Sequence, residues 1–249
     1  MRKFSIVLKL FVVFLALSSS ALYSEAFLDV EGGAAFSGYN DVRIPADTGT
    51  PFSLVKDTQS DPVFALRLRV GYTFADRHTV TLLAAPLTVR GSGVLDRNVT
   101  YYGKTFAAGT RVDSQYRFDS YRLTYRYSFI KTDSLVLAAG LTGKVRSADI
   151  ALMSDTGYAH RTDLGVVPLI NFWAQWNFLE PFSLLLDVDA LVSPYGRAED
   201  GLLALQYHLN RNVAFRLGYR VLEGGADGGG NVYSFALFHY AMAGIRVSW

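Results

Sequence analysis

The feature that most constrains this chain is a two-residue alternation of apolar and polar side chains. The clearest runs are LRLRVGYTF at 66–74, YRLTYRYSF at 121–129 and VAFRLGYRV at 213–221. Successive side chains of a β-strand point to opposite faces of the sheet. The alternation therefore predicts strands with one apolar face and one polar face. After residue 26, no segment holds the ~18 consecutive apolar residues that a membrane-spanning helix needs.

This pattern predicts ten strands, joined by links that alternate in length. The predicted strands are 27–37, 63–74, 78–90, 116–129, 134–146, 164–178, 182–192, 201–209, 213–222 and 232–249. Short links lie at 75–77, 130–133, 179–181 and 210–212, and long links at 38–62, 91–115, 147–163, 193–200 and 223–231. Bacterial transmembrane barrels have short periplasmic turns, longer outer loops and an even strand number. We therefore expect an all-β fold, a transmembrane antiparallel up-and-down barrel of ten strands, with eight as the alternative.

The composition supports a membrane β-protein and excludes several other classes. The chain has 15 Tyr and 17 Phe, and only 18% of its residues are charged, whereas a disordered chain has few aromatics and much charge. Without Cys, the chain has no disulfide, no thiol nucleophile, no Cys-bound metal and no lipid-anchored Cys. A formal net charge of +2 argues against a nucleic-acid-binding surface.

Residues 1–26 are predicted to be a secretory signal peptide, which leaves 27–249 as the barrel. Arg2 and Lys3 precede an apolar stretch, and small residues follow up to a cleavage point after Ala26. Cleavage removes three of the 24 basic and one of the 22 acidic residues. The mature chain is then electrically neutral.

The two faces of the predicted strands differ in their expected surroundings. On the apolar face, Leu66, Leu123, Leu137, Leu186 and Leu217 are expected to contact lipid. The same face ends in aromatic residues beside the short turns, at Tyr72, Phe74, Tyr127, Phe129, Trp176, Phe178, Tyr207 and Trp249. Aromatic side chains concentrate at membrane interfaces, so these eight predict an interfacial belt. A soluble sandwich with an aromatic core is the alternative.

The polar face is expected to line the lumen with charge. It carries nine basic and four acidic residues: Asp29, Glu31, Arg67, Arg69, Arg122, Arg126, Lys144, Arg146, Asp187, Asp189, Arg216, Arg220 and Arg246. A barrel of about eight strands is just filled by its side chains, and an unpaired buried charge is costly. Two interpretations stay open: a structural ion network that locks the barrel, and a narrow, charge-selective channel.

Sequence position also predicts which of these charges meet. Asp29 and Glu31 are expected to form an ion cluster at the periplasmic base with Arg69 and Arg246. Arg67 is expected to face Asp187 and Asp189 across the lumen, because their strands lie five apart in a ring of ten. The excess of basic groups favours anions in a narrow pore.

The last strand resembles a known class of proteins. It alternates through Ala241, Ala243, Ile245 and Val247 to an aromatic end at Trp249, which resembles the C-terminal strand of bacterial outer-membrane β-barrels. The chain looks like the small porin-like barrels of the OmpW, OmpX and OmpA-barrel kind, although a count of ten strands resembles the omptin proteases and OpcA-type adhesins. The resemblance implies a monomer in the bacterial outer membrane, contact with the bilayer and lipopolysaccharide-type lipids, and recognition by the outer-membrane assembly machinery.

The histidines do not match the enzyme families that share this architecture. Omptins place paired acids and an Asp–His dyad at the outer rim, but here the inward His208 lies beside a periplasmic turn, and His160 near Asp163 is a lone loop histidine. His239 resembles the lipid A deacylase histidine, yet Ala241 stands where that family has its Ser nucleophile. We therefore expect no catalytic residue, no metal site, no cofactor and no nucleic-acid partner.

Two functions follow from these expectations. The first is a narrow porin-like channel for small, anionic solutes. The alternative is a closed structural or adhesive barrel whose extracellular loops bind a host or envelope partner, since long loops on a rigid barrel are common contact surfaces.

Overall fold

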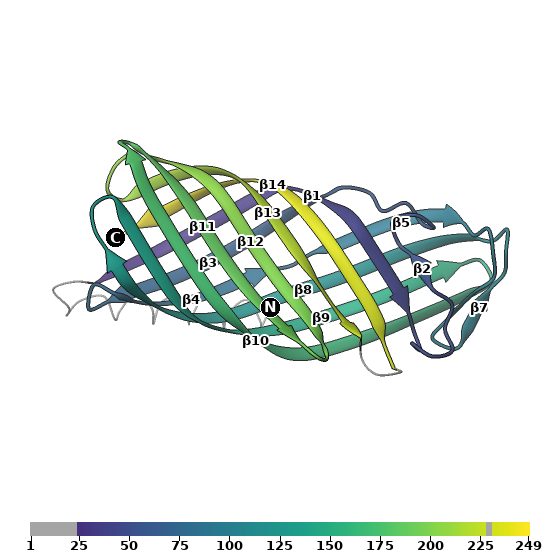
Figure 1. Ribbon diagram of the computed structural model, residues 1–249. Coiled ribbons are helices and arrows are strands. Elements are labelled where there is room, and N and C mark those ends of the chain that lie inside the picture. The colour runs from purple at the N-terminus through teal and green to yellow at the C-terminus, as the bar shows by residue number, and fades with distance from the viewer. Residues whose placement is uncertain (1–23, 228–230) are drawn as a thin grey trace, which may run out of the picture.

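Ten antiparallel strands follow one another around a closed barrel in the computed structural model, which describes residues 24–227 and 231–249 (Figure 1). They are β1 (Glu25–Arg43), β3 (Val63–Phe74), β4 (His78–Ala85) continued by β5 (Thr88–Val94), β8 (Arg111–Lys131), β9 (Leu135–Ser154), β10 (Gly157–Leu179), β11 (Phe182–Ser193), β12 (Gly196–His208), β13 (Val213–Asp227) and β14 (Tyr233–Ser248). Each strand pairs with the next, and β14 pairs with β1 to close the ring. The predicted fold class and the count of ten are confirmed.

The predicted signal peptide falls outside the described residues up to position 23. Strand β1 begins at Glu25, two residues before the predicted cleavage point. Among the described residues, no helix is both long and apolar enough to cross a membrane.

The turns at the periplasmic end agree with the prediction to within two residues. The strands reverse at 75–77, 132–134, 180–181 and 209–212. At 75–77, Ala75 and Asp76 both adopt positive φ angles of 45° and 64°, a left-handed backbone that tight hairpins need.

Three of the predicted outer loops are wrong, because the strands continue through them. The segment 147–163 forms the ends of β9 and β10 with a turn of two residues, and 193–200 likewise contains a two-residue turn between β11 and β12. Strand β13 extends to Asp227, so most of 223–231 is strand as well. In these segments several outward positions carry polar side chains, among them Asp149, Arg197 and Glu199. The apolar alternation therefore fades there although the backbone ladder continues.

The other two outer links fold back onto the barrel. Within 44–62, β2 (Phe52–Ser53) pairs with the end of β1, and the Leu54 amide donates to the Asn40 carbonyl at 2.8 Å. Further along, the Asp61 amide donates to the Arg90 carbonyl of β5 at 2.9 Å. The segment therefore bridges β1 and β5 above the start of β3, and completes the wall there.

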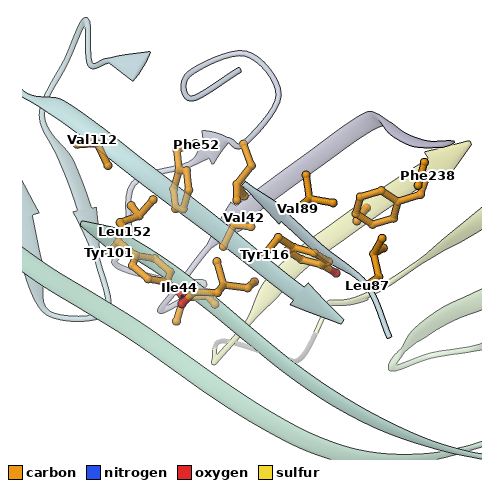
Figure 2. Close-up of a cluster of buried hydrophobic side chains, with 14 of the residues drawn as sticks. Val42, Ile44, Phe52, Leu87, Val89, Tyr101, Val112, Tyr116, Leu152 and Phe238 are labelled. Atoms are coloured by element: carbon orange, nitrogen blue, oxygen red, sulfur yellow. Dashed lines mark hydrogen bonds between the residues drawn. The ribbon is translucent and has the colours of Figure 1, made fainter. Parts of the chain in front are cut away.

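Apolar side chains fill the inside of this outer half (Figure 2). The second outer link carries a small hairpin of β6 (Val99–Tyr101) and β7 (Lys104–Phe106). Tyr101 from this hairpin packs edge-on against Phe52, with ring centroids 5.4 Å apart, and its hydroxyl donates to the Ile150 carbonyl at 2.9 Å. We call this cluster the outer core; its main members are Val42, Ile44, Phe52, Leu54, Leu87, Val89, Val99, Tyr101, Phe106, Val112, Tyr116, Ile150, Leu152 and Phe238.

Candidate functional site in the barrel lumen

The outer wall of the barrel is apolar where a bilayer would surround it. Leu66, Leu123 and Leu217 are exposed, Leu217 by 69%, while Leu137 and Leu186 are half-buried. Seven of the eight predicted belt aromatics are exposed and Tyr72 is half-buried: Phe74, Tyr127, Phe129, Trp176, Phe178, Tyr207 and Trp249. An exposed apolar surface of this extent marks contact with a membrane.

Strand β8 shows where the apolar band ends. Its outward side chains run from Phe129 to Tyr121 as large apolar groups, and the next two outward positions are Asp119 and Arg117. These two charges approach to 3.9 Å. At the same level β9 changes to Ser147 and then Asp149. Beyond this level, β5, β8, β9 and β10 continue together past the ends of β11 to β14 (Figure 1).

The inside of the barrel at mid-height is filled with charge centred on Asp200. Its carboxylate accepts hydrogen bonds from Arg67 at 3.0 Å, Arg122 at 2.5 Å and Arg220 at 2.5 Å. The Asp200 residue is only 2% exposed. The three guanidinium groups come from β3, β8 and β13, so one carboxylate ties together strands on different sides of the barrel.

Glu31 and Asp29 extend this cluster toward the periplasmic end. Glu31 accepts from Arg220 at 2.9 Å and lies 3.4 Å from Arg216 and 3.5 Å from Arg67. Asp29 pairs with Arg216. Both carboxylates are buried, and each has at least one arginine partner, as buried charges require.

The two acids of β11 complete the network. Asp187 pairs with Arg69 at 2.8 Å and lies 3.9 Å from Arg126. Asp189 accepts from Arg122 at 2.7 Å. Asn171 of β10 donates to both carboxylates, at 3.2 Å and 2.9 Å. We call these groups the lumen network: Asp29, Glu31, Arg67, Arg69, Arg122, Arg126, Asp187, Asp189, Asp200, Arg216 and Arg220.

The predicted partners inside this network are only partly right. The ladder does place Arg69 and Arg246 directly opposite Asp29, but neither forms the predicted cluster with Asp29 and Glu31. Arg69 instead reaches Asp187 across the lumen. Arg246 pairs with Glu25 at 3.0 Å and lies over the Phe27 ring. Long side chains in a sheared barrel cross to distant strands, so backbone register does not select their partners.

A second correction concerns Arg67, which meets Asp200 and not Asp187 or Asp189. Asp200 was missed because β12 was predicted to begin at residue 201. It shares the inward parity of Leu202, Ala204 and Gln206, which are all buried. Extending the alternation back by one residue would have found it.

The predicted excess of positive charge in the lumen is also too large. Asp200 joins the four predicted acids, Glu25 pairs with Arg246, and Asp163 pairs with Arg146. With Arg161, which also lines the outer cavity, ten basic groups face seven acidic ones, and the excess falls from five to three. The excess is four in a mature chain without Glu25, which the predicted cleavage removes, so the lumen wall is less basic than predicted.

Cavities lie on either side of the lumen network. The inner cavity, of about 260 Å³, opens among the periplasmic turns beside Arg126, His208 and Arg246. The outer cavity, of about 610 Å³, lies beneath the outer hairpins beside Lys144 and Phe238. The lumen network lies between them, and most of its charged side chains are buried.

The histidines lie apart from the lumen network. His208 contacts the Ser183 hydroxyl at 2.8 Å near the periplasmic end. His160 Nδ1 lies 3.3 Å from Asp149 Oδ1, and not beside Asp163 as predicted. Both side chains point outward from the barrel wall. The His160 ring stacks on the Tyr158 ring, which is exposed, and Asp149 lies on the same outward face.

Comparison with known proteins places the fold. No family model matches the chain, and no curated protein matches its sequence. Among solved structures, the outer membrane protease OmpT from Escherichia coli matches with a TM-score of 0.57 at 9% identity, over 94% of this chain and 99% of that one. The protein has the fold of a bacterial outer-membrane β-barrel.

Smaller outer-membrane barrels also match with lower scores. Ail, the attachment invasion locus protein of Yersinia pestis, matches with a TM-score of 0.42 at 10% identity, over 92% of this chain and all of that one. OprG from Pseudomonas aeruginosa matches with a TM-score of 0.37 at 17% identity, over 91% and 97%. The fold shared with OmpT, together with the apolar outer wall, places the protein in the bacterial outer membrane.

Proposed function

We propose that this outer-membrane barrel is closed to free diffusion and acts at the cell surface through its outer half. The observation that carries the proposal is the lumen network. Asp200 binds arginines from three strands, and its neighbours Glu31 and Asp189 bind those same arginines on their other sides. Such a network fills the middle of the described lumen with paired, buried side chains, which supports a closed barrel.

The construction of the outer half supports a contact function. Strands β8 to β10 span 20 to 23 residues, whereas about 9–11 tilted residues cross a bilayer. The extra length carries the outer core. Exposed aromatic side chains lie in the outer turns and near the strand ends, among them Tyr102, Tyr158 and Tyr195, which is 81% exposed. Exposed aromatic rings on a rigid frame are favourable contact points for a partner. The partner class is a host or envelope surface component.

A narrow channel for small anions is the second candidate. It is favoured by the two cavities, which reach the network from opposite ends, and by the remaining excess of basic groups. Conduction would require the network to part, because fixed charges set ion preference only where ions can pass.

Conductance in a planar bilayer separates the two candidates. We expect no channel steps from the purified parent protein, and anion-selective conductance only from a variant that loosens the network, Asp187→Asn with Asp189→Asn. Asp163→Asn, at the open rim, is the matched control and should stay silent. Steady anion-selective conductance from the parent would favour the channel over the closed barrel. A cation-selective reversal potential would contradict the argument that the basic excess in the lumen favours anions.

We also propose that the barrel is not an enzyme, and that it is a monomer whose C-terminal strand is read by the assembly machinery. The His160–Asp149 pair lies on the outer wall, away from any enclosed site in the described residues. Ala241 has no hydroxyl beside His239, which instead stacks on Phe36 and contacts Tyr219. The 9% identity to OmpT carries the fold and not its activity.

A further inference from the structure

Lys144 is a buried cation without a counter-ion at the floor of the outer cavity. The residue is 2% exposed, and it takes part in none of the ion pairs formed within residues 24–227 and 231–249. Its Nζ lies 4.8 Å from the centre of the Phe118 ring. The residue directly opposite on β8 is Arg122, a like charge whose own contacts go to Asp189 and Asp200.

The balance of charges beneath the cavity shows why the unpaired Lys144 matters. The lumen network holds six arginines and five carboxylates, so its own carboxylates are already outnumbered before Lys144 is counted. A buried ammonium group is stable only with an opposite charge or strong hydrogen bonds. The ammonium group lacks a partner carboxylate on the side where the cavity begins, and an anion bound in the cavity would supply one.

The walls of the same cavity are suited to an apolar body. Tyr116, Phe118 and Phe238 line it, and Tyr116 packs against both of the other rings, at 6.2 Å and 5.5 Å between centroids. Arg146, Arg161 and Arg197 also line it, with Asp163 and Glu223 paired to Arg146 and Arg197. The volume of about 610 Å³ falls within the ~300–1,000 Å³ of small-molecule sites, which combine apolar walls with a few placed polar groups.

The cavity also reaches a break in the barrel wall. The ladder between β10 and β11 begins only at Ile170 and Ala190, although β11 continues to Ser193 and β10 starts at Gly157. Pro168 and Leu191, on the two sides of this break, both line the cavity. Pro168 has no amide to donate, as is usual for a strand edge. Leu164 and Val166, on the outward face of β10 next to this break, are both exposed.

We propose that the outer cavity is a binding site for an anionic amphiphile, with its acidic group on Lys144 and its hydrocarbon body against Tyr116, Phe118 and Phe238. The break between β10 and β11 admits the ligand from the outer leaflet. A carboxylate, sulfonate or phosphate head on an apolar chain has this chemistry. The site goes beyond the proposed contact function, and it does not depend on whether the lumen conducts.

The test measures binding of radiolabelled dodecanoate to the folded protein in nanodiscs of neutral phosphatidylcholine. We expect saturable binding at one site, and at least a tenfold loss of affinity in Lys144→Met. This variant should fold, because it replaces an unpaired buried charge with an apolar group of similar shape. Lys56→Met, in the exposed outer segment, is the matched control and should bind like the parent. Dodecanol, which has the same chain without the charge, should not compete.

Several outcomes would overturn the proposal. They are the absence of saturable binding in the parent, an unchanged affinity in Lys144→Met, and equal competition by dodecanol. Arg161→Gln, on the open wall of the cavity, provides a second charge deletion with an expected loss of threefold or more if Lys144→Met does not fold. Hexanoate, which has a shorter chain, tests whether the ligand enters from the outer leaflet. Weak competition by hexanoate supports this entry, and competition equal to that of dodecanoate overturns the role of the break.

Discussion

The inside of this barrel is filled in two different ways at two heights. At mid-height the inward side chains are Arg, Asp and Glu, joined by ion pairs between strands far apart in the chain. In the outer half the inward side chains are Val, Leu, Phe and Tyr, packed against two segments that fold back from the outer links. Both regions are buried, yet one is held by directional charge pairs and the other by the hydrophobic effect.

The difference follows from what surrounds each region. Within the bilayer the outer wall must be apolar, so alternation leaves polar side chains for the inside. Beyond the bilayer the outer wall is wet and carries Arg117, Asp119 and Asp149, so the same alternation leaves apolar side chains for the inside. Along the barrel axis the apolar side chains therefore change from the outward to the inward face, and on β8 this change occurs near Tyr121 and Asp119.

The lumen network and the outer core should respond differently to the loss of one side chain. Removing a carboxylate takes one partner from several buried arginines at once, so the cost is shared by many strands. Removing an apolar side chain leaves a cavity whose cost is local. Substitutions in the two regions separate a shared cost from a local one.

The largest effect is expected from Asp200→Asn. The change leaves Arg67, Arg122 and Arg220 without their shared carboxylate and should lower the free energy of unfolding by about 3–5 kcal/mol. Heat-modifiable gel mobility, read as the fraction folded against temperature or urea, measures it. Asp163→Asn removes an ion pair at the open rim and should cost less than about 1 kcal/mol. Equal melting of both variants would show that the network is not a structural lock.

A more local effect is expected from Phe106→Ala, which truncates a fully buried side chain of the β6–β7 hairpin. The outer core should lose about 3 kcal/mol, enough to open the hairpin transiently while the barrel within the bilayer keeps its heat-modifiable mobility. Limited proteolysis of intact vesicles should then cut within 95–110. Phe64→Ala, at a position 76% exposed, is the control. Simultaneous loss of the barrel and the hairpin would show that the two fillings form one cooperative unit.

The smallest effect concerns the clamp between the two outer segments. Arg97 donates to both carboxylate oxygens of Asp57, at 3.1 Å and 2.9 Å. Partial burial alone would raise the pKa of Asp57, but the hydrogen bonds from Arg97 and the Ser53 amide outweigh it and lower that pKa below its usual value. The stabilisation is then fully present above the unfolded pKa of about 3.9 and is lost as the pH falls through the lowered pKa.

This clamp should contribute less than about 1 kcal/mol, because the Arg97 side chain is largely solvated. Proteolysis of the outer segments should therefore speed up modestly below about pH 4 in the parent. In Asp57→Asn the rate should already be raised at neutral pH, and the acid step should disappear. An acid step that survives in Asp57→Asn would assign the pH dependence to another group.

The sequence by itself determined the strands, their faces and their number. Period-two alternation is a local property, and in the membrane-spanning part it turns the large apolar side chains toward lipid and most charged side chains toward the inside. This is why positions such as Leu123 and Arg122 can be assigned to opposite faces from the adjacent residues in the sequence alone. The strand ends at the periplasmic side were equally readable, because tight turns demand particular residues there.

Only the tertiary structure decided the outer half and the partners within the lumen. The segments 44–62 and 95–110 became wall and core through contacts with distant strands, which their mixed composition did not encode locally. Asp200 escaped detection because the pattern it belongs to weakens where the strand nears water. Arg67 meets Asp200, and Arg69 meets Asp187, because the shear of a closed barrel sets which side chains share a height, and shear is a property of the whole ring of strands.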